Sequence, residues 1–177
     1  MKKRINVTLA LIIIVFMFSF TKNAFAAAKP KDYESIGSAL METESIGLIK
    51  IGSTDKEAAK FLGDSCEKSK PEIYGADGLM HCEWRYIKSG VTLGLVQNEK
   101  KYNICSISIS KPCDLKTARG IGIGTQRKDV LKAYEQEINP EASGENSQIT
   151  AGSVYGGIIF DFEKDIVSGI FIGAAAE

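Results

Sequence analysis

A stretch of sequence that occurs twice constrains the fold more than any other feature. Residues 49–62 and 121–134 both read Ile-x-Ile-Gly, followed by a hydroxyl residue and then by a helical pattern. The glycine allows a backbone conformation that is closed to other residues, and a hydroxyl side chain can cap the first free amides of a helix. Recurrence of this motif predicts two related units in the chain.

Each copy of the motif leads into a predicted amphipathic helix. Apolar residues stand at i, i+3 and i+4 in both copies, so each helix has one apolar face that it cannot bury alone. In the first copy Thr54 and Glu57 form the Thr-x-x-Glu pattern of a capping box. The apolar positions are Ala58, Phe61 and Leu62 in the first copy and Val130, Ala133 and Tyr134 in the second.

The remainder of each predicted unit is strand-like. Apolar and small residues alternate at 90–95 and 157–162, and each segment is followed by a polar turn and a further strand, at 104–110 and 166–173. This pattern is typical of half-buried antiparallel strands joined by hairpins. We therefore predict an α+β fold of two tandem helix-plus-antiparallel-sheet units, whose sheets form a shared open face.

The repeats also define the expected domain boundaries. Repeat unit 1 is predicted at 47–110 and repeat unit 2 at 119–177, with a linker at 111–118 that contains Pro112 and Cys113. Residues 27–46 precede the first unit, and their apolar spacing fits either a short docking helix or a mobile arm.

Residues 1–26 have the pattern of a cleavable signal peptide. Three basic residues come first, an apolar run follows at 9–18, and Ala24-Phe25-Ala26 matches the small-x-small cleavage pattern. The alternative is a membrane anchor, but the apolar run is about half of the ~20 residues that a membrane-spanning helix needs. We expect a secreted or periplasmic protein that keeps no membrane anchor after cleavage.

Loss of the signal peptide changes the charge balance. The signal contains four of the 22 basic residues and no acidic one, so 18 basic residues face 22 acidic ones in the mature chain. Nucleic acids and anionic membranes favour clustered lysine and arginine. A net charge of −4 without a basic cluster therefore excludes nucleic acid as the expected partner.

The mature chain contains four cysteines, an even number that predicts disulfides in an oxidising compartment. Three pairings are possible on this count alone. A zinc site is the alternative, but no Cys-x-x-Cys spacing occurs and His81 is the sole histidine. We expect no metal and no cofactor. The cysteines are Cys66, Cys82, Cys105 and Cys113.

The first unit resembles a known inhibitor family. Ile51-Gly52-Ser53-Thr54 before a helix, residues 63–66, a loop at 67–80 and the His81-Cys82 strand opening are similar to the first domain of the beta-lactamase inhibitory protein family. The resemblance runs from about residue 48 to residue 173. That family is a tandem repeat of helix-plus-four-stranded-sheet units, and the same unit resembles small outer-membrane assembly lipoproteins.

The resemblance implies a disulfide pairing and a mode of action. It pairs Cys66 with Cys82, which leaves Cys105 to close a short loop with Cys113. In the family a concave sheet clamps a beta-lactamase, and an Asp-Tyr loop enters the active site of that enzyme. The corresponding stretch at 85–90 has no acidic residue, which does not favour a beta-lactamase as the target.

The residues predict no catalytic site. Cys82 is better explained as a disulfide partner than as a nucleophile, and its neighbour His81 as a structural residue. Residues 120–124 fit neither phosphate-binding glycine pattern, and the acidic residues at 161–165 lack the form of a calcium loop. We therefore expect a protein that is not an enzyme.

Strand alternation predicts a binding surface instead. Val91, Leu93 and Leu95 are expected to face the helices, and Cys105 to face inward with its strand neighbours Ile107 and Ile109. The leading hypothesis is an exported protein-binding module that inhibits or neutralises an enzyme outside the cytoplasm. A cell-envelope assembly or structural factor is the alternative, and a small secreted hydrolase is the third. The predicted partner-binding face is Glu83, Arg85, Thr92, Ser106, Ser108, Tyr155 and Phe171.

Overall fold

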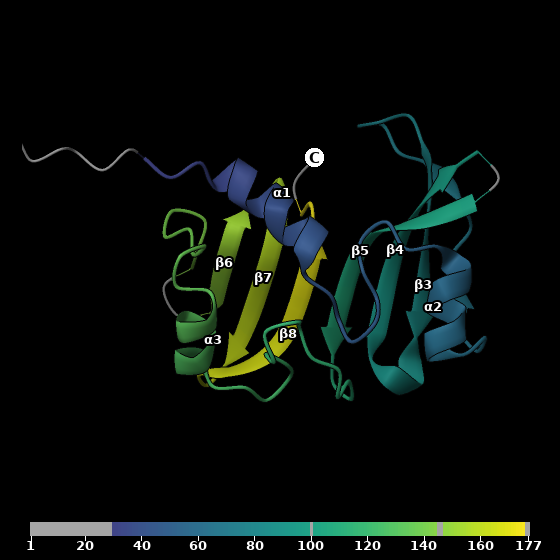
Figure 1. Cartoon of the computed structure of the whole chain (residues 1–177). Helices are drawn as coiled ribbons and strands as arrows, with labels where there is room; N and C mark the ends of the chain where they lie inside the picture. Colours follow the sequence, from purple (N-terminus) through teal and green to yellow (C-terminus); the bar gives the residue numbers. More distant parts are fainter. Residues whose placement is uncertain (1–29, 100, 145–146, 176–177) are drawn as a thin grey trace, which may run out of the picture. The chain divides into compact units, whose positions relative to one another are not determined.

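A computed structural model of the chain describes residues 30–99, 101–144 and 147–175 (Figure 1). The predicted signal peptide, residues 1–26, lies outside the described residues. The chain from Lys31 onward forms one compact unit. Within the described part, no helix has both the length and the apolar character needed to cross a membrane.

The described strands form one antiparallel sheet of eight strands (Figure 1). Its order is β1-β3-β4-β5-β8-β7-β6, and β2 pairs with β3 beside β1. The strand bounds are β1 Glu67–Lys68, β2 Glu72–Ile73, β3 Met80–Tyr86, β4 Val91–Asn98, β5 Lys101–Ser110, β6 Gln148–Ser153, β7 Gly156–Glu163 and β8 Ile166–Gly173.

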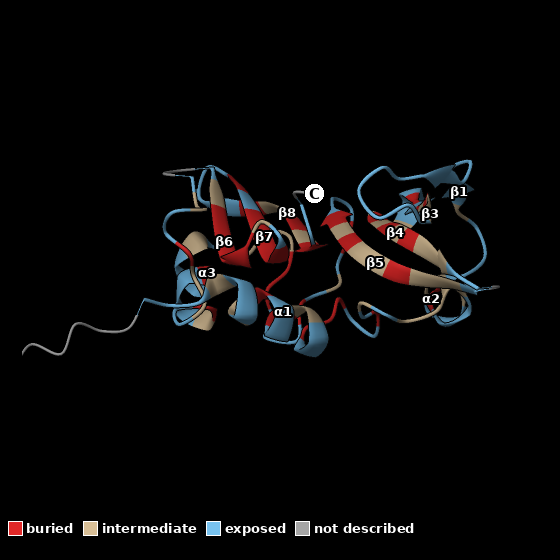
Figure 2. Ribbon diagram, turned by 90° about the horizontal axis from the view of Figure 1, so that it is seen from above, coloured by how far each residue is buried: buried red, intermediate tan, exposed pale blue. Residues whose placement is uncertain are grey.

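Three short α-helices of the described residues lie on one side of this sheet, as Figure 2 shows. They are α1 Tyr33–Thr43, α2 Asp55–Leu62 and α3 Arg127–Ala133, and a 3₁₀ turn, η1 Ile87–Ser89, joins β3 to β4. The apolar side chains of the sheet that face these helices form one hydrophobic core.

The prediction of two tandem helix-plus-sheet units is wrong. Strand β5 pairs directly with β8, with Ile107 opposite Ile172 and Ile109 opposite Ile170, so the strands of both halves belong to one continuous sheet. Helix α1 precedes the first copy of the motif but packs on β6 and β7. The fold is therefore dominated by a single sheet, because the edge strands of the two halves satisfy each other's backbone groups.

The two copies of the motif nevertheless adopt the same local structure. The Gly52 amide donates a hydrogen bond to the Ile104 carbonyl in β5 at 2.8 Å, and the Gly124 amide donates to the Val167 carbonyl in β8 at 2.9 Å. Both glycines have positive φ, 82° and 89°, which favours glycine. Each motif thus fixes the start of a helix to a strand of the sheet.

The helix caps differ between the copies. Thr54 accepts from the Glu57 amide and the Glu57 carboxylate accepts from the Thr54 amide at 2.7 Å, so the predicted capping box is confirmed. The hydrogen bonds that the Glu57 carboxylate accepts from Thr54 lower the pKa of this carboxyl group. At the start of α3, Gln126 is the N-cap and makes no side-chain hydrogen bond to the helix.

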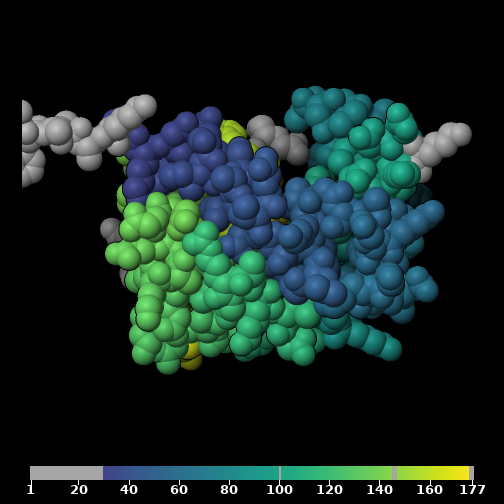
Figure 3. Space-filling view, viewed as in Figure 1, coloured from purple at the N-terminus to yellow at the C-terminus, as the bar shows by residue number. Residues whose placement is uncertain are grey.

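Helix α1 lies very close to the turn between β6 and β7. A Cβ atom built on Gly37 would come within 1.7 Å of the Gly156 carbonyl oxygen, and one built on Gly152 would come within 2.5 Å of the Gly37 Cα. Backbone therefore touches backbone at this contact. In the space-filling view α1 and the chain beside it hide most of the yellow C-terminal strands (Figure 3).

The predicted strand parity is confirmed at most positions but wrong at Cys105. The inward residues of β4, and Ile107, Ile109, Ile170 and Ile172, are all buried in the core. A β-bulge interrupts β5, because Leu95 pairs with Ile104 whereas Gly94 pairs with Ser106. The extra residue is Cys105, whose thiol lies beside His81, away from the core.

The bridge between Cys66 and Cys82 is not formed. The structure, which describes all four cysteines, joins none of them in a disulfide. Strand β1 sets Glu67 opposite Arg85, so Cys66 is level with Tyr86, four residues along β3 from Cys82. At ~3.3 Å per residue this offset exceeds the ~7 Å between Cα atoms that a disulfide can span.

The bridge between Cys105 and Cys113 is not formed either. Cys105 lies in the middle of β5, whereas Cys113 follows the end of that strand, where its amide donates to the Ser110 carbonyl at 2.8 Å. The five strand residues that follow Cys105, up to Ser110, hold the two thiols apart. Strand β5 thus keeps the two cysteines out of bonding distance.

Candidate functional site

The side of the sheet opposite α1, α2 and α3, here called the open face, carries most of the predicted partner-binding residues. Arg85 pairs with Thr92, Thr92 with Ser108, and Ser108 with Phe171, which forms one row across β3, β4, β5 and β8. Paired residues of neighbouring strands share a face. These four predicted residues are therefore brought together.

A second row lies beside the first on the open face. Glu83 pairs with Gly94, and Gly94 pairs with Ser106. Glu83 and Arg85 form an ion pair between the rows, and the Arg85 side chain is 59% exposed. An exposed pair of this kind stabilises the fold little, so its charges remain available to a partner.

Tyr155 does not join these rows. It lies in the turn between β6 and β7, is 63% exposed, and borders a hollow that residues 31–34, at the start of α1, also line. Its amide donates to the Ser153 hydroxyl at 3.1 Å. Tyr155, which was predicted as a second aromatic residue of this face, is a turn residue and has no strand parity.

A groove of about 510 Å³ opens on this face beside the two rows. The loop between β2 and β3 borders one side of it, and Phe171 together with the chain after β8 borders the other. The sheet contributes the bulge in β5. The lining residues are Tyr74, Asp77, His81, Cys82, Glu83, Gly94, Cys105, Ser106, Phe171, Ala174 and Ala175.

Three chemically reactive side chains meet in this groove. The His81 Nε2 atom lies 2.8 Å from the Asp77 Oδ2 atom, and the His81 Nδ1 atom lies 3.9 Å from the Cys105 Sγ atom. The His81 ring stacks on Tyr74, with centroids 4.1 Å apart and an interplanar angle of 6°. The His81 side chain is 11% exposed, so its orientation is fixed by contacts on several sides.

The loop between β2 and β3 holds Asp77 in place. The Leu79 amide donates to the Asp77 Oδ1 atom at 2.9 Å, and the Tyr74 amide donates to the Leu79 carbonyl at 3.0 Å. The Leu79 hydrogen bond, followed by that of His81, lowers the pKa of the Asp77 carboxyl. Asp77 is therefore a carboxylate that accepts hydrogen bonds from both sides.

The sequence prediction missed this constellation. It assigned His81 a structural role and Cys105 a disulfide, and it gave Asp77 no role. The spacing of Asp77 and His81 offers a weak signal, because a carboxylate and a histidine four residues apart can meet in a tight hairpin. The bulge that turns Cys105 toward them has no signature in the sequence.

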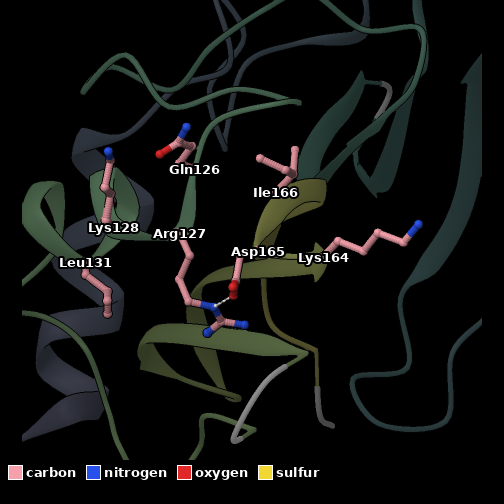
Figure 4. Close-up of a pocket in the computed structure, with 7 residues that line it drawn as sticks. All are labelled: Gln126, Arg127, Lys128, Leu131, Lys164, Asp165 and Ile166. Carbon is pink, nitrogen blue, oxygen red and sulfur yellow. Dashed lines mark hydrogen bonds and ion pairs between the residues drawn. The ribbon is translucent and has the colours of Figure 1, made fainter.

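In a second hollow, drawn in Figure 4, two of the charged residues pair with each other. Arg127 forms an ion pair with Asp165 at 2.9 Å, and its guanidinium lies 4.1 Å from the centre of the Phe162 ring. These contacts fix the start of α3 to the turn between β7 and β8. Their role is structural.

The described residues contain no group of three or more histidine, cysteine, aspartate or glutamate side chains arranged to hold a metal ion. Comparison of the chain with known protein families, with curated proteins and with solved structures found no match.

Proposed function

We propose that this chain is an exported protein that binds a protein partner through the open face, as an enzyme inhibitor or an immunity-type neutraliser. The observation that supports it most is the row of Arg85, Thr92, Ser108 and Phe171 across four neighbouring strands. Arginine and aromatic residues contribute most of the binding energy at many interfaces. Export is supported by the signal-like pattern at 1–26.

The residues between Arg85 and Phe171 suit close approach of a partner. Thr92 and Ser108 are short and partly exposed, so a partner can reach the sheet between the two larger side chains. Their hydroxyl groups can donate and accept hydrogen bonds. The face therefore has two large side chains that can anchor a partner, with short polar side chains between them. The resemblance to an inhibitor family favours an enzyme as the partner.

Affinity capture tests this proposal. The mature protein, residues 27–177, is immobilised and exposed to envelope and culture fractions of the producing cells, and the retained protein is then titrated in purified form. We expect Phe171→Ala and Arg85→Ala each to weaken binding about tenfold or more. Leu131→Ala is the matched control, because Leu131 is an exposed apolar residue of α3.

The outcomes separate the alternatives. Loss of catalytic activity in a captured enzyme supports inhibition, whereas retention of outer-membrane assembly machinery would favour an envelope factor. Unchanged affinity in the double variant of Arg85 and Phe171 would contradict the assignment of the face, as would an equal loss in Leu131→Ala.

A further inference from the structure

The groove on the open face contains a chain of three groups with the geometry of an activated thiol. The Asp77 carboxylate can only accept hydrogen bonds, so the His81 Nε2 atom, 2.8 Å away, is the donor. In a neutral imidazole this leaves the Nδ1 lone pair directed to the Cys105 thiol at 3.9 Å. A nucleophile beside a base that a third group orients is the arrangement that covalent catalysis uses.

The surroundings hold this geometry and leave room for a ligand. Tyr74 stacks on the His81 ring. At Gly94 a side chain would intrude, because a Cβ atom there would lie 2.3 Å from the Ser106 Oγ atom and 3.5 Å from the Cys105 Sγ atom. The groove of about 510 Å³ gives access to the thiol.

The other three cysteines lie in different surroundings. Burial raises the pKa of the Cys82 and Cys113 thiols, and both residues belong to the core. Cys66 packs against the same core. Cys82 also borders the groove, but it is buried in the core, so Cys105 is the thiol that the groove presents beside His81.

We propose that Cys105 is a nucleophilic thiol that captures a small disulfide compound as a mixed disulfide, with His81 as its base and Asp77 as a positioning residue. This reactivity goes beyond the proposed partner binding and does not depend on it. Thiol–disulfide exchange requires a thiolate and access to a disulfide sulfur, and both requirements match what the groove provides.

The exchange balances without a further oxidant. The Cys105 proton passes to the His81 Nδ1 atom, and the thiolate attacks one sulfur of the small disulfide. The sulfur–sulfur bond of that compound breaks as a new bond to the Cys105 Sγ atom forms. The departing thiolate takes the proton from His81 and leaves as a thiol, and the reaction stops at the mixed disulfide.

The charges of the groove select the ligand. The carboxylates of Asp77 and Glu83 both line it, whereas the guanidinium of Arg85 is paired with Glu83 and lies outside the lining. Opposite charges attract across a cleft of low dielectric constant. The groove therefore favours a cationic aminothiol disulfide, such as cystamine, over an anionic one, such as glutathione disulfide.

The test is the reaction of the mature protein with cystamine, followed by intact mass and by peptide mapping without reduction. We expect one cysteamine adduct per chain, on Cys105, formed about tenfold faster at pH 7 than in His81→Ala. Cys105→Ser should form no adduct, and Cys66→Ser is the matched control that should react like the wild type. Circular dichroism establishes that each variant is folded.

The pH profile separates a base from a merely structural residue. The titratable groups around His81 are Glu72, its pair on β2, together with Tyr74 and Asp77 from the loop, Glu83 from β3 and Cys105 from β5. We expect the wild-type rate to depend less on pH than the rates of His81→Ala and His81→Gln, which should keep increasing up to about pH 8.5, as for an ordinary thiol. Asp77→Asn should give an intermediate rate.

Three results would overturn the proposal. The first is equal rates and pH profiles in the wild type and the folded His81 variants, and the second is an adduct that maps to another cysteine. The third is a faster reaction with glutathione disulfide than with cystamine, which would contradict the charge argument. By that argument, Glu83→Gln should lower the ratio of the cystamine rate to the glutathione disulfide rate.

Discussion

The two halves of the sheet satisfy their polar groups in different ways. Behind β6–β8 the side chains of a set of buried and partly exposed residues, here called the Arg119 cluster, pair with one another. Glu44 is 3% exposed and accepts from the Arg119 Nε atom at 2.8 Å, and Arg119 also pairs with Glu137 at 3.2 Å. The Tyr134 hydroxyl donates to Thr117 at 3.0 Å. These five residues form the Arg119 cluster.

The half around β3–β5 includes a buried hydroxyl group with less support. The buried Tyr86 hydroxyl makes no hydrogen bond of ordinary geometry within the described residues, although the nearby Cys66 thiol helps to raise the pKa of Tyr86. The same half of the sheet contains the Cys105 thiol, 3.9 Å from the His81 Nδ1 atom. A satisfied buried network makes a structure rigid, whereas groups with spare hydrogen-bonding capacity are common at functional sites. The difference assigns stability to the Arg119 cluster and reactivity to the β3–β5 half.

The largest expected effect is on the contact that positions the Arg119 cluster. Gly37→Ala should destabilise the protein by about 3 kcal/mol, because the new methyl group meets the Gly156 backbone and must displace α1, which leads into Glu44. Urea unfolding measures this. Ser38→Ala, at an exposed neighbour on the same helix, should change stability by less than about 0.5 kcal/mol. Equal values for both variants would contradict the close packing of α1.

Removal of one charge from the cluster is the next effect in size. Glu44→Gln should cost about 2 kcal/mol, below the usual loss for a buried pair because Arg119 is a third exposed and keeps Glu137. Glu42→Gln, at an exposed position of α1, is the control. Thermal unfolding of both variants measures this loss of stability. A Glu44→Gln variant as stable as the wild type would show that the Arg119 cluster contributes little to stability.

The smallest effect compares the two buried tyrosines directly. Tyr134→Phe should cost about 1 kcal/mol because it leaves Thr117 without its donor, whereas Tyr86→Phe removes an unpaired hydroxyl and should be neutral or stabilising. Chemical denaturation at neutral pH distinguishes the two results. A larger loss for Tyr86→Phe would reverse the comparison.

The same tyrosines predict a pH dependence. Burial raises the pKa of both phenols above the ordinary value of 10, so the unfolded chain ionises before the folded protein does. The stability that each neutral phenol contributes is then present below pH 10 and is lost as the pH rises above it. The unfolding free energy should fall above pH 10, and less steeply in each Phe variant.

Local patterns in the sequence predicted part of this fold. The capping box of Thr54 and the inward positions of β4 follow from local chemistry and strand periodicity, and the structure confirms them. The pairing of β5 with β8 could not be predicted, because the residues of an edge strand do not identify the strand beside it. That pairing turned two expected sheets into one.

The candidate site divides in the same way. Strand parity was sufficient to place the residues from Arg85 to Phe171 on one face, but their continuous row also depends on the pairing of β5 with β8. The site at Cys105 depends on a one-residue bulge, which reverses the direction of a side chain, and on a hairpin that carries Asp77 to His81. Neither is determined by residue type alone.

The most direct test of the difference between the two halves is the alkylation rate of each cysteine in the folded protein at neutral pH, mapped by mass spectrometry without reductant. We predict that Cys105 reacts first and that Cys82 and Cys113, whose thiols burial keeps protonated, react last, with all four modified after denaturation. Alkylation of Cys82 or Cys113 as fast as that of Cys105 would contradict this prediction. So would a Cys105 that stays unmodified in denaturant.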